Sequence, residues 1–372
     1  MLLYFYPFGS IKFDNIETLH CNGDGTSPII VCYDQEPITK EVDTLLQQIR
    51  ESWGAHRFIL LLNTESNSQI KNTLADRWYL KDCYYFFHIF AAADWFRGYQ
   101  YCTELLPPAQ RKIKKKYITF NRITGNSRAY RSFFVSELQK HKLIEHGHVS
   151  YSDVCPEHGH YEENILETII KHNVDTEYVL KARHHLSQID FPLRIDFKDA
   201  AFIDNGSQTL NAIPEMMESF LHVVTETCFW EIKDHLTEKI FKPIVARQPF
   251  ILLGCANNLA YLKSYGFKTF DAWWDEGYDQ IEDPLKRIQA VVKIVNDICN
   301  MSTQELEHLL VDMSETLNYN YNLFYSRNFV NDAWEEVKMS MHQQVVQLPS
   351  RTWSETLLQN CATNSYHNTP NV

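Results

Sequence analysis

The chain of 372 residues is longer than one ordinary hydrophobic core supports, so its length predicts two domains of about 150 residues each. Its 44% hydrophobic and 22% charged residues are typical of a packed globular protein, which excludes wholesale disorder, a collagen-like fibre and a membrane bundle. The longest apolar stretch, residues 84–96, contains His88 and Asp94 and is shorter than the roughly 18–20 residues of a membrane helix. We therefore expect no membrane partner.

The N-terminus and the cysteines indicate a reducing compartment. The first residues, MLLYFYPFGSIKFD, lack a basic region and a small-residue cleavage site, so they predict a strand and not a signal peptide. The nine cysteines are an odd number, and no two of them form a CxxC motif. Buried free thiols in the cytoplasm are expected, rather than a disulfide framework.

The charge of the chain is unevenly distributed. The formal net charge of −12 argues against a protein coated in positive charge for nucleic acid. Residues 107–142, however, contain ten Lys or Arg and a single acid, Glu137. Five of the basic residues are close together: Arg111, Lys112, Lys114, Lys115 and Lys116. We expect an anion near this segment.

Short apolar runs alternate with amphipathic stretches along the chain, which predicts an α/β fold. Strands are expected at residues 2–6, 29–33, 58–62, 116–120, 149–151, 200–203, 222–225, 249–253 and 267–270. Helices are expected at residues 39–53, 127–141, 236–247, 257–265, 283–299 and 303–316. A Pro-rich and then basic junction divides the chain into two Rossmann-like domains that face a cleft, residues 1–110 and 111–320. Residues 321–348 are expected to form a helical segment that can cross back to the first domain, and residues 349–372 a polar tail.

The usual nucleotide and hydrolase fingerprints are absent. The chain has no GxxxxGK[ST], GxGxxG, HExxH or GxSxG motif, and only 12 glycines. Any phosphate must then be held by side-chain cations and helix N-termini.

Two segments supply such groups. In the first, Arg128 and Arg131 lie in the opening turns of a predicted helix, where an arginine can bind two phosphate oxygens; the alternative is a solvated basic face. In the second, Thr237 is a predicted N-cap, so that Glu238 and Lys239 occupy a first helical turn. A carboxylate there can accept ribose hydroxyls and an ammonium can neutralise a diphosphate; the alternative is a plain amphipathic helix. Pro243 predicts a kink or an early break in this helix.

An ordered set of motifs resembles the donor domain of GT-B glycosyltransferases. They are HVVTET (residues 222–227), LTEKIFKPI (236–244), PFIL (249–252), GFKTF (266–270) and DEGYD (275–279). The chain is most similar to the group related to the family 10 fucosyltransferases, and closer still to phage-borne relatives that share a YDQEP motif, here residues 33–37. The resemblance implies two Rossmann-like domains, acceptor-side and then donor-binding, in a protein of the host cytoplasm if phage-encoded.

The resemblance also assigns roles by position. It implies that Arg131 binds the donor pyrophosphate, Glu238 the ribose and Lys239 a phosphate, with Glu226 and Lys242 near that site. Such enzymes invert the sugar without a metal or other cofactor, using a base from the first domain. Glu36 or Asp34 would be that base, although the DQEP sequence can instead be a strand-to-helix turn that Pro37 initiates.

The substrates remain open at this stage. A nucleotide sugar, UDP- or GDP-linked, is the expected donor. The basic segment and the phage-like motifs favour 5-hydroxymethylcytosine in double-stranded DNA as the acceptor of a glucosyl or arabinosyl group, and the base would have to flip out to react. The net charge favours a surface or lipopolysaccharide glycan instead. A non-catalytic DNA- or glycan-binding protein on the same fold is a further alternative.

A histidine-rich segment offers a competing metal site. His141, His146, His148, Cys155, His158 and His160 lie within 20 residues, and such side chains can bind zinc. Their spacing matches no closed zinc site, so we expect surface and loop residues here and no metal.

Overall fold

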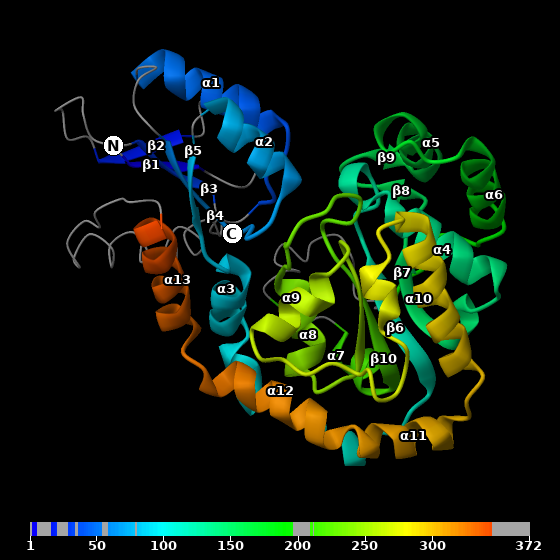
Figure 1. Cartoon of the computed structure of the whole chain (residues 1–372). Coiled ribbons are helices and arrows are strands. Elements are labelled where there is room, and N and C mark those ends of the chain that lie inside the picture. The colour runs from blue at the N-terminus through cyan, green and yellow to red at the C-terminus, as the bar shows by residue number, and fades with distance from the viewer. Residues whose placement is uncertain are drawn as a thin grey trace, which may run out of the picture. The chain divides into compact units, whose positions relative to one another are not determined.

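The computed structural model describes residues 2–5, 16–20, 29–33, 36–53, 59–78, 80–195, 209–210 and 212–343 (Figure 1). These residues form two compact units, one drawn from the ranges Met1–Ala91 and Asn328–Val372 and the other from Ala92–Arg327. Each unit has a mainly parallel sheet flanked by helices, so the predicted α/β class is confirmed. The strand expected at 200–203, the tail at 349–372 and Asp34 lie outside the described residues.

The first unit contains a five-stranded sheet in the order β2-β1-β3-β4-β5. Its strands are β1 (Leu2–Phe5), β2 (Ile16–His20), β3 (Ile29–Tyr33), β4 (Ile59–Asn63) and β5 (Leu80–Tyr84). Strands β1, β3, β4 and β5 are parallel, and β2 pairs antiparallel with β1. The expected strands at 2–6, 29–33 and 58–62 are therefore confirmed.

Helices α1 (Glu41–Trp53) and α2 (Gln69–Trp78) connect the parallel strands of this unit. Apolar residues recur every three to four positions in α1, and this stripe packs on β3 and β4. The resulting core contains Ile29, Val31, Val42, Leu45, Leu46, Ile49, Ile59 and Leu61. Helix α3 (Phe87–Trp95) follows β5, and α13 (Phe329–Gln343) packs against β5 from the far end of the chain.

The second unit contains a four-stranded, wholly parallel sheet in the order β11-β10-β6-β7. The strands are β6 (Lys115–Asn121), β7 (Gly147–Tyr151), β10 (Ser219–Thr225) and β11 (Phe250–Leu253). Every residue of β10 and β11 is buried, because helices cover both faces of the sheet. A small hairpin of β8 (Val154–Cys155) and β9 (Gly159–His160) lies apart from this sheet.

The helices of the second unit lie on both faces of its sheet, with α4 and α10 on one side and α8 and α9 on the other (Figure 1). They are α4 (Tyr130–Lys140), α5 (Tyr161–Lys171), α6 (Thr176–Leu186), α7 (Ile213–Met217), α8 (Glu238–Val245), α9 (Asn258–Ser264), α10 (Pro284–Cys299), α11 (Thr303–Asp312) and α12 (Ser314–Ser326). Cys32, Cys83, Cys155, Cys228 and Cys255 are buried free thiols, as predicted.

The two units differ in their bounds from the predicted domains. Residues 92–110 belong to the second unit, where Tyr325 in α12 donates a hydrogen bond to the carbonyl of Phe96 at 2.9 Å. The chain rejoins the first unit at Asn328, and Ser340 in α13 accepts a hydrogen bond from the backbone N–H of Tyr84 at 3.1 Å. These contacts join residues far apart in the sequence, so local composition does not reveal the boundary.

Two predicted elements need correction. Residues 267–270 form a loop and not a strand, because the N–H of Lys268 bonds to Asn320 Oδ1 and that of Phe270 to Glu276 Oε1. The helix expected at 303–316 is two helices, α11 and α12, which meet at Met313. Pro243 does not break α8 where it occurs, since that helix continues to Val245.

Candidate functional site

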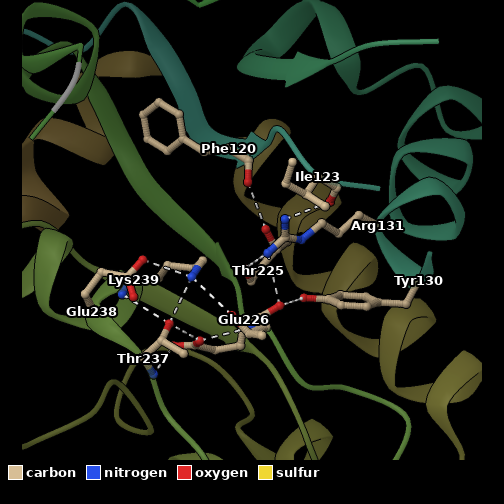
Figure 2. Close-up of polar contacts among 10 residues, drawn as sticks. Phe120, Ile123, Tyr130, Arg131, Thr225, Glu226, Thr237, Glu238 and Lys239 are labelled. Atoms are coloured by element: carbon tan, nitrogen blue, oxygen red, sulfur yellow. Dashed lines mark hydrogen bonds and ion pairs between the residues drawn. The ribbon is translucent and has the colours of Figure 1, made fainter. Parts of the chain in front are cut away.

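The candidate site lies where the strand order of the second unit changes direction. The chain passes from β6 outward to β7 on one side and from β10 outward to β11 on the other. Open α/β sheets bind ligands outside the carboxyl ends of the two strands at such a switch point. Here those ends are joined by Thr225, whose Oγ1 lies 3.0 Å from the carbonyl of Phe120 (Figure 2). The same Oγ1 lies 3.1 Å from Asn121 Oδ1.

Arg131 fills this switch point. Its guanidinium donates to the carbonyls of Ile123 at 2.9 Å, Thr225 at 2.8 Å and Glu226 at 3.1 Å (Figure 2). The residue is 3% exposed, and burial lowers its pKa, while its Nε has no hydrogen-bond partner among the described residues. Arg131 therefore joins the ends of β6 and β10, with most of its donors committed to backbone carbonyls and not directed at a ligand.

Tyr130 also binds the backbone at the carboxyl end of β10, a role that the sequence did not indicate. Its hydroxyl donates to the carbonyl of Glu226 at 2.6 Å, and its ring stacks on Phe229 with centroids 4.0 Å apart. The only sequence signal was its position next to Arg131. The backbone at Glu226 is thus held by two side chains of α4.

The side chain of Glu226 is fully buried and turned toward the start of α8. Its Oε2 accepts from Thr237 Oγ1 at 2.6 Å and from the N–H of Thr227 at 3.2 Å, and its Oε1 accepts from the N–H of Thr237 at 3.3 Å. Burial raises the pKa of Glu226, against the opposing effects of Lys239 and Thr237. This carboxylate fixes the residue that begins α8.

The predicted N-cap at Thr237 is confirmed, with its Oγ1 accepting from the N–H of Lys239 at 3.5 Å. Lys239 Nζ donates to three oxygens: Thr227 Oγ1 at 3.2 Å, Thr237 Oγ1 at 3.1 Å and Glu238 Oε1 at 2.9 Å. The side chain of Lys239 is 30% exposed and that of Glu238 is 9% exposed. The partly exposed ammonium of Lys239 and the adjacent carboxylate of Glu238 thus lie at the N-terminus of α8, where anions are favoured.

Two further basic residues, Lys242 in α8 and His222 in β10, are buried near enough to act on one another electrostatically. Burial lowers the pKa of Lys242 to about 8, with Glu238 opposing the effect and Lys239 adding to it. Burial, together with the charge of Lys242, lowers the pKa of His222 in β10 to about 3. His222 is therefore neutral at physiological pH, and Lys242 carries the local charge.

Arg128 lies close to Arg131 but differs from it. It ends a short 3₁₀-helix, Asn126–Arg128, is half-buried, and adds to the lowering of the Arg131 pKa through like-charge repulsion. In the described part of the chain its guanidinium has no hydrogen-bond or ion-pair partner. Of the two predicted arginines, Arg128 is the one with donors available to a ligand.

The five residues of the predicted basic cluster differ in burial and in their partners. Arg111 is 2% exposed and donates to the carbonyls of Leu106 and Ala246, and burial lowers its pKa to about 9. Lys112 pairs with Glu307, Lys114 with Glu218, Lys115 with the carbonyl of Glu145 and Lys116 with that of Met301. These residues lie before and at the amino end of β6, opposite its carboxyl end, so they do not border the candidate site.

The first unit places Glu36 after the carboxyl end of β3, half-buried. The sequence reading missed a neighbouring group of buried polar residues at the end of β4. Glu65 Oε1 accepts from the N–H of Ile38 at 2.8 Å, Asn63 Oδ1 accepts from the N–H of Glu65 at 3.0 Å, and Lys71 Nζ donates to the Glu65 carbonyl. The signal was a polar run, Asn63-Thr64-Glu65, directly after an apolar strand. This network holds the loop that follows Glu36.

The side chains of the histidine-rich segment have separate partners. His148 contacts Glu218 at 2.8 Å, His160 caps α5, and His158 packs so closely on Gly125 that a Cβ there would clash with its ring. Within the described ranges, no three His, Cys, Asp or Glu side chains come together as a metal site.

Fold and site together define an α/β protein with two units, each built on a mainly parallel sheet. In the second unit, a lysine and a glutamate lie in the first turn of α8, near the switch point of the sheet. None of the helices in the described ranges combines the length and hydropathy of a membrane span. Comparisons with family models, with curated proteins and with solved structures found no match for this chain.

Proposed function

We propose that the protein is a glycosyltransferase of GT-B architecture that uses a nucleotide-sugar donor, with the second unit as its donor-binding half. The observation that carries the proposal is the hydrogen-bonded series Glu226, Thr237, Lys239 and Glu238 at the N-terminus of α8 (Figure 2). It supplies an ammonium for a diphosphate and a carboxylate for a ribose diol at the edge where α/β sheets bind ligands.

Transfer would proceed by direct displacement. The acceptor oxygen forms a bond to the anomeric carbon while the bond from that carbon to the diphosphate oxygen breaks, which inverts the sugar. A carboxylate takes the acceptor proton, and Glu36 of the first unit is our candidate for this base. Lys239, Lys242 and Arg128 would stabilise the charge that develops on the leaving diphosphate.

The acceptor is proposed to be a neutral hydroxyl on a glycan. The support for DNA is weaker than the sequence suggested, because Arg111 is buried and the neighbouring lysines have acidic or carbonyl partners. 5-Hydroxymethylcytosine DNA stays the second candidate, favoured by the side chains of Lys112 and Lys114, which are 83% and 72% exposed.

A donor panel tests the proposal in two stages. UDP- or GDP-sugars should raise the melting temperature, because a ligand that binds only the folded state stabilises it. The stabilising donor is then incubated with oligosaccharides and with hydroxymethylcytosine DNA, and the products are identified by mass spectrometry. If no nucleotide sugar changes the melting temperature and no product forms, a non-catalytic binding protein becomes the better explanation.

A further inference from the structure

All three hydrogens of the Lys239 ammonium are used within the protein. They are donated to Thr227 Oγ1 at 3.2 Å, Thr237 Oγ1 at 3.1 Å and Glu238 Oε1 at 2.9 Å. An ammonium has three N–H donors and no more. A phosphate oxygen can therefore bind Lys239 in full only by replacing one of these three oxygens.

The two threonines are poor candidates for replacement. Thr237 is the N-cap of α8, and its hydroxyl donates to Glu226 Oε2 at 2.6 Å. The same buried carboxylate accepts from the backbone N–H of Thr227 at 3.2 Å. Glu226 thus holds both threonines in place beneath Lys239.

Glu238 is the partner that a phosphate can replace without loss of charge at Lys239. Its carboxylate is the one negatively charged group bonded to Lys239, and it is carried on a side chain with three rotatable bonds. Replacing this carboxylate by a phosphate keeps an anion against the ammonium throughout, so the charge-assisted bond is conserved.

The exchange has a cost that depends on the ligand. A displaced Glu238 carboxylate remains in the first turn of α8, next to the incoming anion, and like charges at this separation repel. Two hydroxyls offset that repulsion, because each donates a hydrogen bond to the carboxylate. A simple phosphate lacks such donors, whereas a ribose carries them close to its diphosphate.

We propose that Glu238 is a specificity-determining residue that guards Lys239. Its carboxylate keeps the hydrogen bond to the Lys239 ammonium in the presence of simple phosphate anions. It is displaced by a ligand that supplies a diphosphate and a vicinal diol together. The inference rests on the proposed function in one respect, since it takes the Glu238–Lys239 pair as the donor site.

Calorimetry with inorganic pyrophosphate tests whether Glu238 keeps simple phosphates from Lys239. Glu238→Gln should bind pyrophosphate about threefold to fivefold more tightly than the wild type, the factor that such an ion pair is worth. Glu215→Gln removes the same charge at α7, which precedes the amino end of β10, and should leave the affinity unchanged. Adding Lys239→Gln to Glu238→Gln should abolish the gain, and Glu238→Ala provides a second variant without the carboxylate.

Nucleoside diphosphates with and without a 2′-hydroxyl test whether the displaced Glu238 carboxylate binds a ribose diol. The wild-type protein should prefer UDP or GDP over the 2′-deoxy form by at least about tenfold, and Glu238→Gln should bind the two forms with similar affinity. Unchanged pyrophosphate affinity in Glu238→Gln and Glu238→Ala would show that Glu238 does not keep phosphate from Lys239, whether or not the protein binds nucleotide sugars. If neither UDP nor GDP binds the wild type, the proposed function fails, while tighter pyrophosphate binding by Glu238→Gln would still support the exchange at Lys239.

Discussion

The guanidinium of Arg131 donates a hydrogen bond across 3.1 Å to the backbone carbonyl of Glu226, while the carboxylate of Glu226 accepts from Thr237 at 2.6 Å. Two residues that the sequence suggested as donor ligands are therefore joined to each other. Together they connect the strand ends of the sheet to the first turn of α8. In the proposed donor site they would act by placing Lys239 and Glu238 and not by contacting the donor, and their variants should behave accordingly.

Arg131→Ala should lower the free energy of unfolding by about 2–4 kcal/mol, because the carbonyls of Ile123 and Thr225 lose the guanidinium donor and that of Glu226 keeps only Tyr130. Urea denaturation measures the change. Arg128→Ala is the matched control and should change stability by less than about 0.5 kcal/mol. Equal stability of the two variants would show that the Arg131 contacts are dispensable.

Arg128→Ala should instead weaken nucleotide-sugar binding by about 1.5–3 kcal/mol, the value of a hydrogen bond to a charged group. The expectation follows from its half-buried guanidinium, which has no partner in the described ranges. Calorimetry with the donor measures it, and Arg122→Ala, an exposed arginine after β6, is the control. A loss of affinity equal in both variants would point to general charge attraction instead of a contact by Arg128.

The titration of Lys242 should be visible in stability. Burial lowers its pKa from 10.5 to about 8, so the unfolded chain binds this proton more tightly than the folded protein does. Above pH 10.5 Lys242 is neutral in both states, so the free energy of unfolding is not reduced by a buried charge. This advantage is lost as the pH falls through about 8, where the buried side chain becomes charged. The difference in free energy of unfolding between the wild type and Lys242→Met should change across that interval. A difference that is constant with pH would contradict a desolvated Lys242.

Donor affinity should fall as the pH rises above about 8, because the charge that Lys242 contributes to the site is lost there. Calorimetric titrations with one nucleotide sugar, at fixed ionic strength and at several pH values, would show the decrease. In Lys242→Met the affinity should be lower at neutral pH and should change less across this interval. The same pH dependence in both proteins would assign the effect to another group.

Transfer should continue at full rate in EDTA. Lys239, Lys242 and Arg128 can take the charge of the diphosphate, and no carboxylate cluster in the described ranges forms a metal site. Product formation is measured after dialysis against EDTA and again with added magnesium or manganese. An absolute requirement for either ion would place the chemistry elsewhere, with the acidic segment at residues 275–279 the first to examine.

The triple substitution of Lys114, Lys115 and Lys116 by Gln should leave donor affinity and transfer to a glycan unchanged, because these residues lie at the amino end of β6. If DNA is the acceptor, the variant should bind duplex DNA more weakly and with a flatter salt dependence, by about 0.9 in slope per lost phosphate contact. Salt-dependent retention of the wild type on DNA at physiological ionic strength would restore DNA as the leading acceptor.

Several elements of the fold were readable from the sequence, although β5, α2, α3, α5 and α6 were not predicted. Apolar runs of four to five residues marked β3, β4 and β11, because strands buried on both faces have few polar positions. The N-cap at Thr237 was equally local, since a threonine hydroxyl bonds to an N–H two residues later. Such features depend on neighbours in the chain, which the sequence displays directly.

The use of each charged side chain was decided by the tertiary structure. Arg111, Arg128 and Arg131 belong to one basic segment, yet the first and the last are buried against carbonyls and the middle one keeps free donors. Besides a nearby carbonyl, each buried arginine binds a distant one, that of Ala246 for Arg111 and that of Thr225 for Arg131, which are 135 and 94 residues away in the sequence. A charged group acquires its role from the polarity and the acceptors around it, and only the folded chain brings those acceptors within hydrogen-bonding distance.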